Sequence, residues 1–271
     1  MSLKAPIFNK VAVIGVGLLG GSLCCDLAAR NIAQLISIWD PSPTVLNEAL
    51  NRGIAHSVGA SVAEAAAGAD LVVVAPPPQY IPTVLQEIAQ ASPLPAIITD
   101  LGSVKMSPCT VGEGLFGERF VGGHPMAGSA KCGIGAAHEG LFEGAAWAVV
   151  GIDQPIEAVG SPTAVLCHFI RAIGANPVLL TAHEHDRCTA LISHLPHMLS
   201  FAYQSLVETS EDHEMALKLA GGSYRDFSRI SASNRSLWDA IFRENRRELL
   251  GLARKYVRDL QSMCTWLENE T

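Results

Sequence analysis

His124 is the side chain of this sequence best placed to exchange a proton with a bound molecule. It comes directly after the segment Phe120–Gly123 and begins the glycine-rich stretch His124–Ser129. Because free imidazole titrates near pH ~6.5, this residue can accept a proton at neutral pH. A lone histidine is more often structural than catalytic, but its place at the end of a predicted strand favours a general base.

Ser103 is a second candidate, in the stretch Asp100–Lys105, where a strand is expected to end and a helix to begin. Its hydroxyl suits two roles at that position. It can cap the N-terminus of the helix, or it can point into the crevice at the end of the strand. The spacing leaves both roles open, with capping somewhat favoured on this stretch alone.

Ser193, His194 and His197 lie in one predicted helix, and His183 and His185 precede them. The spacings H-x-H and H-x-x-H are weak metal patterns, and no carboxylate or cysteine completes a ligand set at a known spacing. We therefore expect no metal and favour hydrogen bonding to a substrate for the first three residues. The alternative is a helix whose polar side meets a domain interface.

Arg225 and Arg229 lie in Gly221–Ile230, which we predict to be a glycine-rich turn. A guanidinium forms two parallel hydrogen bonds with a carboxylate, so either arginine suits an acidic substrate. Ion pairing with Asp226 or Glu214 is the alternative. The spacing does not decide between the two.

The stretch Gly15–Gly20 has the pattern G-x-G-x-x-G, which alone is weak evidence. Here it follows the apolar segment Val11–Gly15 and opens a predicted helix over Gly21–Arg30. A glycine loop between a strand and a helix is typical of dinucleotide binding. A glycine turn in an α/β fold that binds no dinucleotide is the alternative.

Each residue of this loop has a distinct expected role. Gly15 permits a tight turn, Gly17 lets the backbone approach a pyrophosphate, and Gly20 lets helix and strand pack closely. The N–H groups at the start of the helix, where Leu18 and Leu19 lie, carry partial positive charge and bind phosphate.

Asp40 ends the second predicted strand, 20 residues after Gly20. A carboxylate there accepts hydrogen bonds from both ribose hydroxyls of NAD and repels the 2′-phosphate of NADP. No arginine follows at once, so we expect NAD, with NADP less favoured and FAD a smaller alternative. Pro76 follows another predicted strand and begins a loop that either lies over the cofactor or forms a rigid surface turn.

Short apolar segments alternate with helical patterns up to about residue 180, which predicts a doubly wound, mostly parallel α/β sheet of the Rossmann type. The predicted strands are Val11–Gly15, Leu35–Asp40, Leu71–Ala75, Ala96–Leu101, Phe120–Gly123, Trp147–Gly151 and Asn176–Leu180. The predicted helices between them are Gly20–Arg30, Pro43–Arg52, Ser61–Gly68 and Tyr80–Ala91.

From about residue 183 the predicted elements are all helices, namely Glu184–Thr209, Glu211–Leu219, Ser233–Arg247 and Glu248–Glu268. Helices with many apolar faces need a partner, either the first domain or a second chain. We therefore expect a nucleotide-binding domain over residues 1–181. An all-helical domain over 182–271 is expected to bind substrate and to form a homodimer.

The 271-residue chain has a formal net charge of −7, and 49% of its residues are hydrophobic. This composition excludes a disordered chain, and the acidic balance argues against nucleic acid or an anionic membrane as partner. No apolar run approaches the ~18–20 residues that span a bilayer. The seven scattered cysteines form no C-x-x-C pair and favour reduced thiols in the cytoplasm.

Five motifs in this order resemble the prephenate/arogenate dehydrogenases of tyrosine biosynthesis, and the resemblance spans residues 10 to about 245. They are GVGLLGGSL, DLGSVK, GGHPMAGS, SHLPH and GGSYRDFSRI. The third and fifth are specific to that family, whereas the glycine loop is not. The resemblance implies NAD-dependent oxidative decarboxylation of prephenate to 4-hydroxyphenylpyruvate, within aromatic amino acid biosynthesis.

The resemblance also implies roles for individual residues. His124 would accept the proton of the ring hydroxyl. Ser103 would hydrogen-bond to His124 and to that hydroxyl. Arg229 would bind a substrate carboxylate, with Arg225 a weaker candidate. Ser193, His194 and His197 would line the pocket.

The chain departs from the family at Ala130, where many members carry an acid associated with gating and substrate recognition. Use of arogenate, or of both substrates, is therefore the first alternative. A β-hydroxyacid dehydrogenase is a second, although the lysine it usually carries after the nucleotide domain is missing from 160–210. A non-catalytic NAD sensor is a third. We expect no mutase domain before residue 10 and no regulatory domain after 271.

Overall fold

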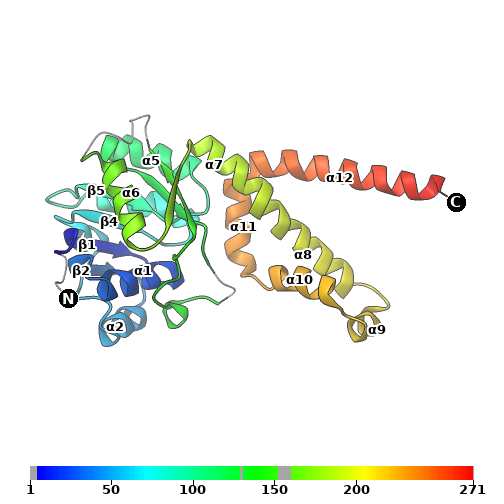
Figure 1. Ribbon diagram of the computed structural model, residues 1–271, viewed down its shortest axis with the longest axis horizontal. Coiled ribbons are helices and arrows are strands. Elements are labelled where there is room, and N and C mark those ends of the chain that lie inside the picture. The colour runs from blue at the N-terminus through cyan, green and yellow to red at the C-terminus, as the bar shows by residue number, and fades with distance from the viewer. Residues whose placement is uncertain (1–4, 129–130, 152–159, 271) are drawn as a thin grey trace. The chain divides into compact units, whose positions relative to one another are not determined.

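The computed structural model describes residues 5–128, 131–151 and 160–270. It divides the chain into two compact units, Met1–His185 and Asp186–Thr271, which we call the first and the second unit (Figure 1). The exact position of the domain boundary, expected between residues 181 and 182, stays a prediction.

The first unit is built on a sheet of five parallel strands in the order β3-β2-β1-β4-β5. This order, in which the chain reverses direction across the sheet after β3, is that of dinucleotide-binding domains. The predicted doubly wound fold is therefore confirmed. The strands are β1 (Phe8–Ile14), β2 (Ala33–Trp39), β3 (Ser57–Val58), β4 (Leu71–Val74) and β5 (Ile97–Asp100).

Both faces of this sheet are covered by other elements, which explains why its strands are continuous apolar segments in the sequence. In β1, Val11 and Val13 pack into one core cluster and Ala12 and Ile14 into another. Alternate residues of a strand point to opposite faces, so both faces of the sheet are covered. Helices α1 (Leu18–Ala29), α2 (Pro43–Asn51) and α6 (Pro162–Ala172) contribute to the first cluster, and α3 (Val62–Ala66), α4 (Ile81–Ile88) and α5 (Met106–Phe116) to the second.

A second sheet extends this unit beyond β5. Strand β6 (Gly122–Pro125) pairs antiparallel with β7 (Ala146–Val150), which pairs parallel with β8 (Asn176–Leu179). A parallel bridge between Ile98 and Phe120 joins β5 to the chain just before β6. His124 therefore lies inside β6, opposite Ala148, rather than in a loop after a strand as predicted.

The second unit is helical, as predicted. Its helices are the end of α7 (Ala182–Thr189), a π-helical turn (Ala190–His194), α8 (Leu195–Glu208), α9 (His213–Lys218), α10 (Gly222–Ser231), α11 (Arg235–Glu244) and α12 (Arg246–Asn269). Among the described residues, no helix is both long enough and apolar enough to cross a membrane.

The predicted glycine-rich turn over Gly221–Ile230 is wrong. Only Gly221 is extended there, as the N-cap of α10, and the residues after it form a regular helix. No residue after Gly222 in this stretch breaks a helix, and Ser200 of α8 donates a hydrogen bond to the carbonyl of Phe227. The two glycines thus lie at the N-cap and the first position of the helix, where glycine is tolerated, and the hydrogen bond to Phe227 joins α10 to α8.

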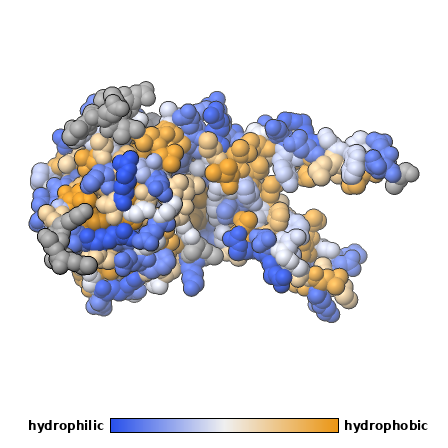
Figure 2. Space-filling view, viewed as in Figure 1, coloured by the Kyte–Doolittle hydropathy of each residue, from blue (hydrophilic) through white to orange (hydrophobic). Residues whose placement is uncertain are grey.

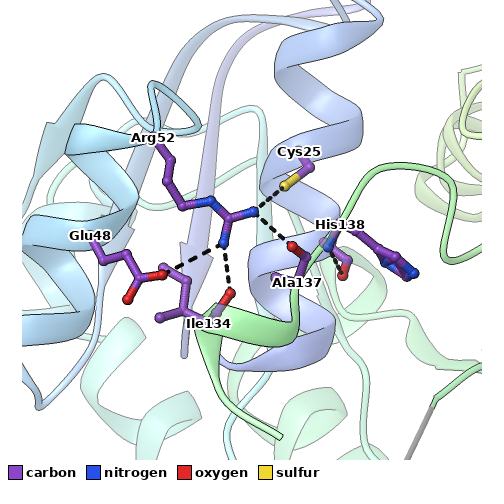
Figure 3. A network of polar contacts seen from close by, with 7 residues as sticks. Cys25, Glu48, Arg52, Ile134, Ala137 and His138 are labelled. Atoms are coloured by element: carbon purple, nitrogen blue, oxygen red, sulfur yellow. Dashed lines mark hydrogen bonds and ion pairs between the residues drawn. The ribbon is translucent and has the colours of Figure 1, made fainter. Parts of the chain in front are cut away.

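Arg52 ties the segment after β6 to the first helices of the unit (Figure 3). Its guanidinium donates hydrogen bonds of 2.6 Å to the carbonyl of Ile134 and 2.7 Å to that of Ala137. It also lies 3.6 Å from Cys25 Sγ and 3.9 Å from a carboxylate oxygen of Glu48. The chain that follows β6 is thus anchored at one end to α1 and α2.

Replacing Arg52 with Met is expected to lower the free energy of unfolding by about 1.5–3 kcal/mol, because two buried carbonyls lose a charged donor. Urea denaturation measures this change. Arg171→Met, at an exposed position of α6, is the matched control and should stay within about 0.5 kcal/mol of the parent. Equal stability of the two variants would show that the anchor contributes nothing.

Candidate active site

The glycine loop has a backbone that explains two of its three glycines. Gly15 has φ of +93°, and a Cβ there would lie 2.8 Å from the carbonyl carbon of Ala75 and from the nitrogen of Pro76. A Cβ on Gly20 would lie 2.0 Å from the carbonyl oxygen of Gly15. A Cβ on Gly17 would meet nothing within 4 Å, so open space lies beside the backbone there.

The start of α1 and the end of β2 offer what a dinucleotide needs. Helix α1 begins at Leu18, and its N-cap residue, Gly17, makes no side-chain cap. Unpaired N–H groups and partial positive charge at such an N-terminus bind phosphate oxygens. Asp40 Oδ2 accepts a 2.9 Å hydrogen bond from the Val16 N–H, and Oδ1 accepts one from Ser42.

Asp40 is therefore held against the glycine loop with its carboxylate oriented by the backbone. A carboxylate has about four acceptor positions, so two hydrogen bonds leave room for ribose hydroxyls. Pro76 directly follows the residue that Gly15 packs against. These residues fit a dinucleotide whose pyrophosphate lies at the start of α1.

His124 is buried, and its Nδ1 lies 2.8 Å from Nε2 of His185. The two rings meet edge to face, with centroids 5.1 Å apart. His185 comes from the first turns of α7, and sequence reasoning weighed it only as a metal ligand. Among the described residues, no group of three or more His, Cys, Asp and Glu side chains is placed to hold a metal.

Asp100, at the end of β5, accepts hydrogen bonds from three residues around this site. Its Oδ2 accepts hydrogen bonds from the N–H of Gly102 and from Lys105 Nζ, and its Oδ1 accepts one of 3.2 Å from the N–H of Gly123. The side chains of Asp100 and Lys105 are both completely buried. The pair thus joins the loop that carries Ser103 to the strand that carries His124.

Ser103 is not the cap of the following helix. The N-cap residue of α5 is Lys105, with no side-chain cap hydrogen bond, and Ser103 lies two residues before it. Its side chain is half-buried in the loop after β5. The capping role is therefore wrong, and the other role, a hydroxyl directed to the end of the strand, stays a prediction.

The second unit brings several of its predicted residues together. His197 stacks on Trp238, with ring centroids 3.4 Å apart, and its Nδ1 donates a 2.9 Å hydrogen bond to the carbonyl of Ser193. His194 is buried, and its Nδ1 lies 3.1 Å from Nδ2 of Asn245. Sequence reasoning missed Trp238 and Asn245, because neither belongs to a motif.

Arg229 lies close enough to His197 to act on it electrostatically. Burial is the largest effect and lowers the pKa of His197, the hydrogen bond to the Ser193 carbonyl raises it, and the charge of Arg229 lowers it again. A neutral imidazole beside a guanidinium suits an anionic ligand.

The guanidinium groups of Arg229 and Arg225 belong to exposed residues of α10. In the part of the chain that the structure describes, neither forms an ion pair with Asp226 or Glu214. The alternative that these arginines serve only as ion-pair partners therefore finds no support. Ala130, the point of departure from the family, lies outside the described residues.

Replacing Lys105 with Met is expected to lower the free energy of unfolding by about 3–5 kcal/mol, because the Asp100 carboxylate stays buried without its cation. Thermal or urea denaturation measures the loss. The double variant Asp100→Asn/Lys105→Met removes both charges and should recover part of it. If the single variant were as stable as the parent, the pair would not hold this edge of the sheet.

Comparison with known proteins gives one consistent result. Residues 25–159 match the family model described as prephenate dehydrogenase, nucleotide-binding domain, and residues 181–271 match the one described as prephenate dehydrogenase, dimerization domain. A prephenate dehydrogenase of Bacillus subtilis is 29% identical over 97% of this chain and 71% of its own length.

Two further relatives extend this result. A cyclohexadienyl dehydrogenase of Zymomonas mobilis is 29% identical over 97% of this chain and 90% of its own length. The crystal structure of a prephenate dehydrogenase from A. aeolicus, in complex with hydroxyphenyl propionate and NAD+, has a TM-score of 0.87 at 26% identity. It covers 100% of this chain and 93% of the other.

Proposed function

The chain belongs to the prephenate dehydrogenase family, and we propose that it oxidises prephenate with NAD, releasing CO₂ and forming 4-hydroxyphenylpyruvate. The observation that carries this proposal is the buried His124 on β6, whose Nδ1 lies 2.8 Å from Nε2 of His185, a contact that orients the imidazole. Bound NAD supplies the acceptor for the hydride. The glycine loop and Asp40 hold it.

The residues of the chain act on the proton and on the carboxylates of the substrate. His124 Nε2 takes the proton of the ring hydroxyl, which leaves the electron pair of the oxygen to drive hydride departure from the carbon that bears it. The bond between the ring and its carboxylate breaks as CO₂ leaves, its electron pair makes the ring aromatic, and the ring oxygen regains a proton as the phenol. Ser103 hydrogen-bonds to that hydroxyl and to His124. The Asp100–Lys105 pair holds the loop of Ser103 and the strand of His124 in fixed positions relative to each other.

The second unit binds the charged end of the substrate in this proposal. Arg229 forms a bidentate pair of hydrogen bonds with a carboxylate, and Arg225 adds positive charge. The neutral ring of His197, held by Trp238, forms a wall of the pocket. Ser193 and His194 complete the lining.

Arogenate is the alternative substrate, because it differs only in an ammonium group where prephenate has a keto group. The cyclohexadienyl dehydrogenase relative supports this alternative as well as the use of both substrates. Following NADH formation with each compound, side by side, tests the proposal. Turnover of prephenate supports it, and turnover of neither compound contradicts it.

A homodimer formed through the second unit is part of the proposal. On α12, Val257, Leu260, Cys264 and Leu267 recur at steps of three and four residues and are exposed. Figure 2 shows further apolar surface on the helices of this unit. A helix stripe of this kind packs against a second helix, and the match of residues 181–271 to a dimerization domain favours a second copy of the chain.

We also propose a cytoplasmic location, supported by the cysteines. All seven are free thiols, and four of them are buried, namely Cys24, Cys25, Cys109 and Cys167. Free thiols in this number suit a reducing compartment.

Replacing His124 with Asn is expected to lower kcat by about 10²–10⁴-fold, the usual contribution of a general base, while the Kd for NAD stays unchanged. Stopped-flow or steady-state absorbance of NADH measures kcat. His168→Asn, at an exposed position of α6, is the control and should behave like the parent. A kcat within a factor of about two of the parent would remove His124 from the base role.

Replacing Arg229 with Ala is expected to raise KM for prephenate by about 10- to 100-fold, because a charged hydrogen bond to a carboxylate is lost. KM for NAD should not change, since the glycine loop lies in the other unit. Arg243→Ala, at an exposed position of α11, is the matched control. An unchanged KM for prephenate would exclude Arg229 from the substrate pocket.

A further inference from the structure

We propose that His185 is a positioning residue that fixes the tautomer and the orientation of the His124 imidazole. This inference rests on the proposed function of His124 as the base. His185 is 1% exposed and His124 9% exposed, so their contact is shielded from water. The 2.8 Å separation of His124 Nδ1 and His185 Nε2 is that of a strong hydrogen bond.

The proton between the two rings decides whether His124 can act. A neutral imidazole carries one N–H and one acceptor nitrogen. If Nδ1 of His124 carries the proton, it donates to His185 Nε2, and Nε2 of His124 is the acceptor nitrogen that takes the substrate proton. If His185 donates instead, His124 carries its proton on Nε2 and cannot serve as a base there.

The productive arrangement therefore requires His185 to be the acceptor, with its own proton on Nδ1. The proton that His124 gains from the substrate stays on Nε2, and His185 gains none. The bond from His124 then has a cationic donor and becomes stronger. Because this gain arises only as the proton is transferred, it stabilises the transition state more than the bound substrate and acts on kcat.

The backbone of His124 is already held at its other end. His124 pairs with Ala148 across β6 and β7, and the preceding Gly123 donates its N–H to Asp100. Rotation of the imidazole ring by about half a turn would exchange the positions of its two nitrogens. The hydrogen bond with His185 opposes this rotation.

Two substitutions separate hydrogen bonding from packing. His185→Phe keeps an aromatic ring but accepts no hydrogen bond, and it should lower kcat by about 10- to 100-fold, the usual loss when a partner that orients a functional histidine is removed. KM for prephenate and Kd for NAD should change by less than about two-fold, since neither ligand touches His185 in this proposal. His185→Gln offers an amide oxygen near the position of Nε2 and should recover most of the rate.

Two controls exclude a merely structural effect. His183→Phe, at an exposed position of the same helix α7, should keep the parental kcat. In the His124→Asn background, His185→Phe should cause no further loss, because the residue it positions is absent. A kcat of His185→Phe within about two-fold of the parent, or a full additional loss in that background, would overturn the proposal.

Nitrogen-15 NMR of the histidine rings tests the pairing without turnover. The parent should show His124 protonated at Nδ1 and unprotonated at Nε2, and His185→Phe should show a mixture of tautomers. Protonation of His124 at Nε2 in the parent would overturn the proposal even in an active enzyme. If the parent oxidised neither prephenate nor arogenate, the proposed function would fail, and this spectrum would still decide the role of His185.

Discussion

Strands β1, β2, β4 and β5 run parallel, and their carboxyl ends therefore meet at one edge of the sheet. The glycine loop, Asp40, Pro76 and the loop with Ser103 follow these four strands in turn. Residues far apart in the sequence are thus neighbours because of strand direction alone. The bridge between Ile98 and Phe120 extends the arrangement to β6 and to His124.

The polar groups buried at this edge fix the positions of the segments that meet there. They add little to the free energy of unfolding. A buried ion pair stabilises a fold little more than an apolar pair of similar size, because both charges lose their hydration. The carboxylate of Asp100 nevertheless bonds to its own loop, to Lys105 and to Gly123. Moving either the loop after β5 or strand β6 would break a hydrogen bond in a place that water does not reach. The segments that carry His124 and Ser103 are therefore held relative to each other before any substrate arrives.

Local patterns predicted the elements better than they predicted the contacts between side chains. Apart from the short β3, which was not predicted, the strands of the first unit and the glycine loop follow from apolar runs and spacing, and the structure has them within a few residues. The start of helix α5 was predicted after Asp100–Lys105, but its extent was not, because Pro108, Gly112 and Gly114 weaken its pattern. Helix α6 was not predicted either, although Ser161 and the following proline are a usual helix start. Helix α10 was predicted as a turn because of its two glycines, whereas Gly221 is its N-cap and Gly222 its first residue.

The partners of the candidate site residues could not be predicted from the sequence, for a physical reason. His185 lies 61 positions from His124 along the chain, and only the fold brings the two rings together. Trp238 and Asn245 meet the SHLPH segment in the same way, through helix packing.

The most direct test of the account is a crystal structure of the chain with NAD and 4-hydroxyphenylpyruvate. The account predicts that Nε2 of His124 lies within about 2.6–3.2 Å of the ring hydroxyl oxygen. It also predicts that Arg229 is paired with the carboxylate of the same molecule and that the pyrophosphate lies at the start of α1. A product molecule that touches only one of these two side chains, or a dinucleotide bound elsewhere, would contradict it.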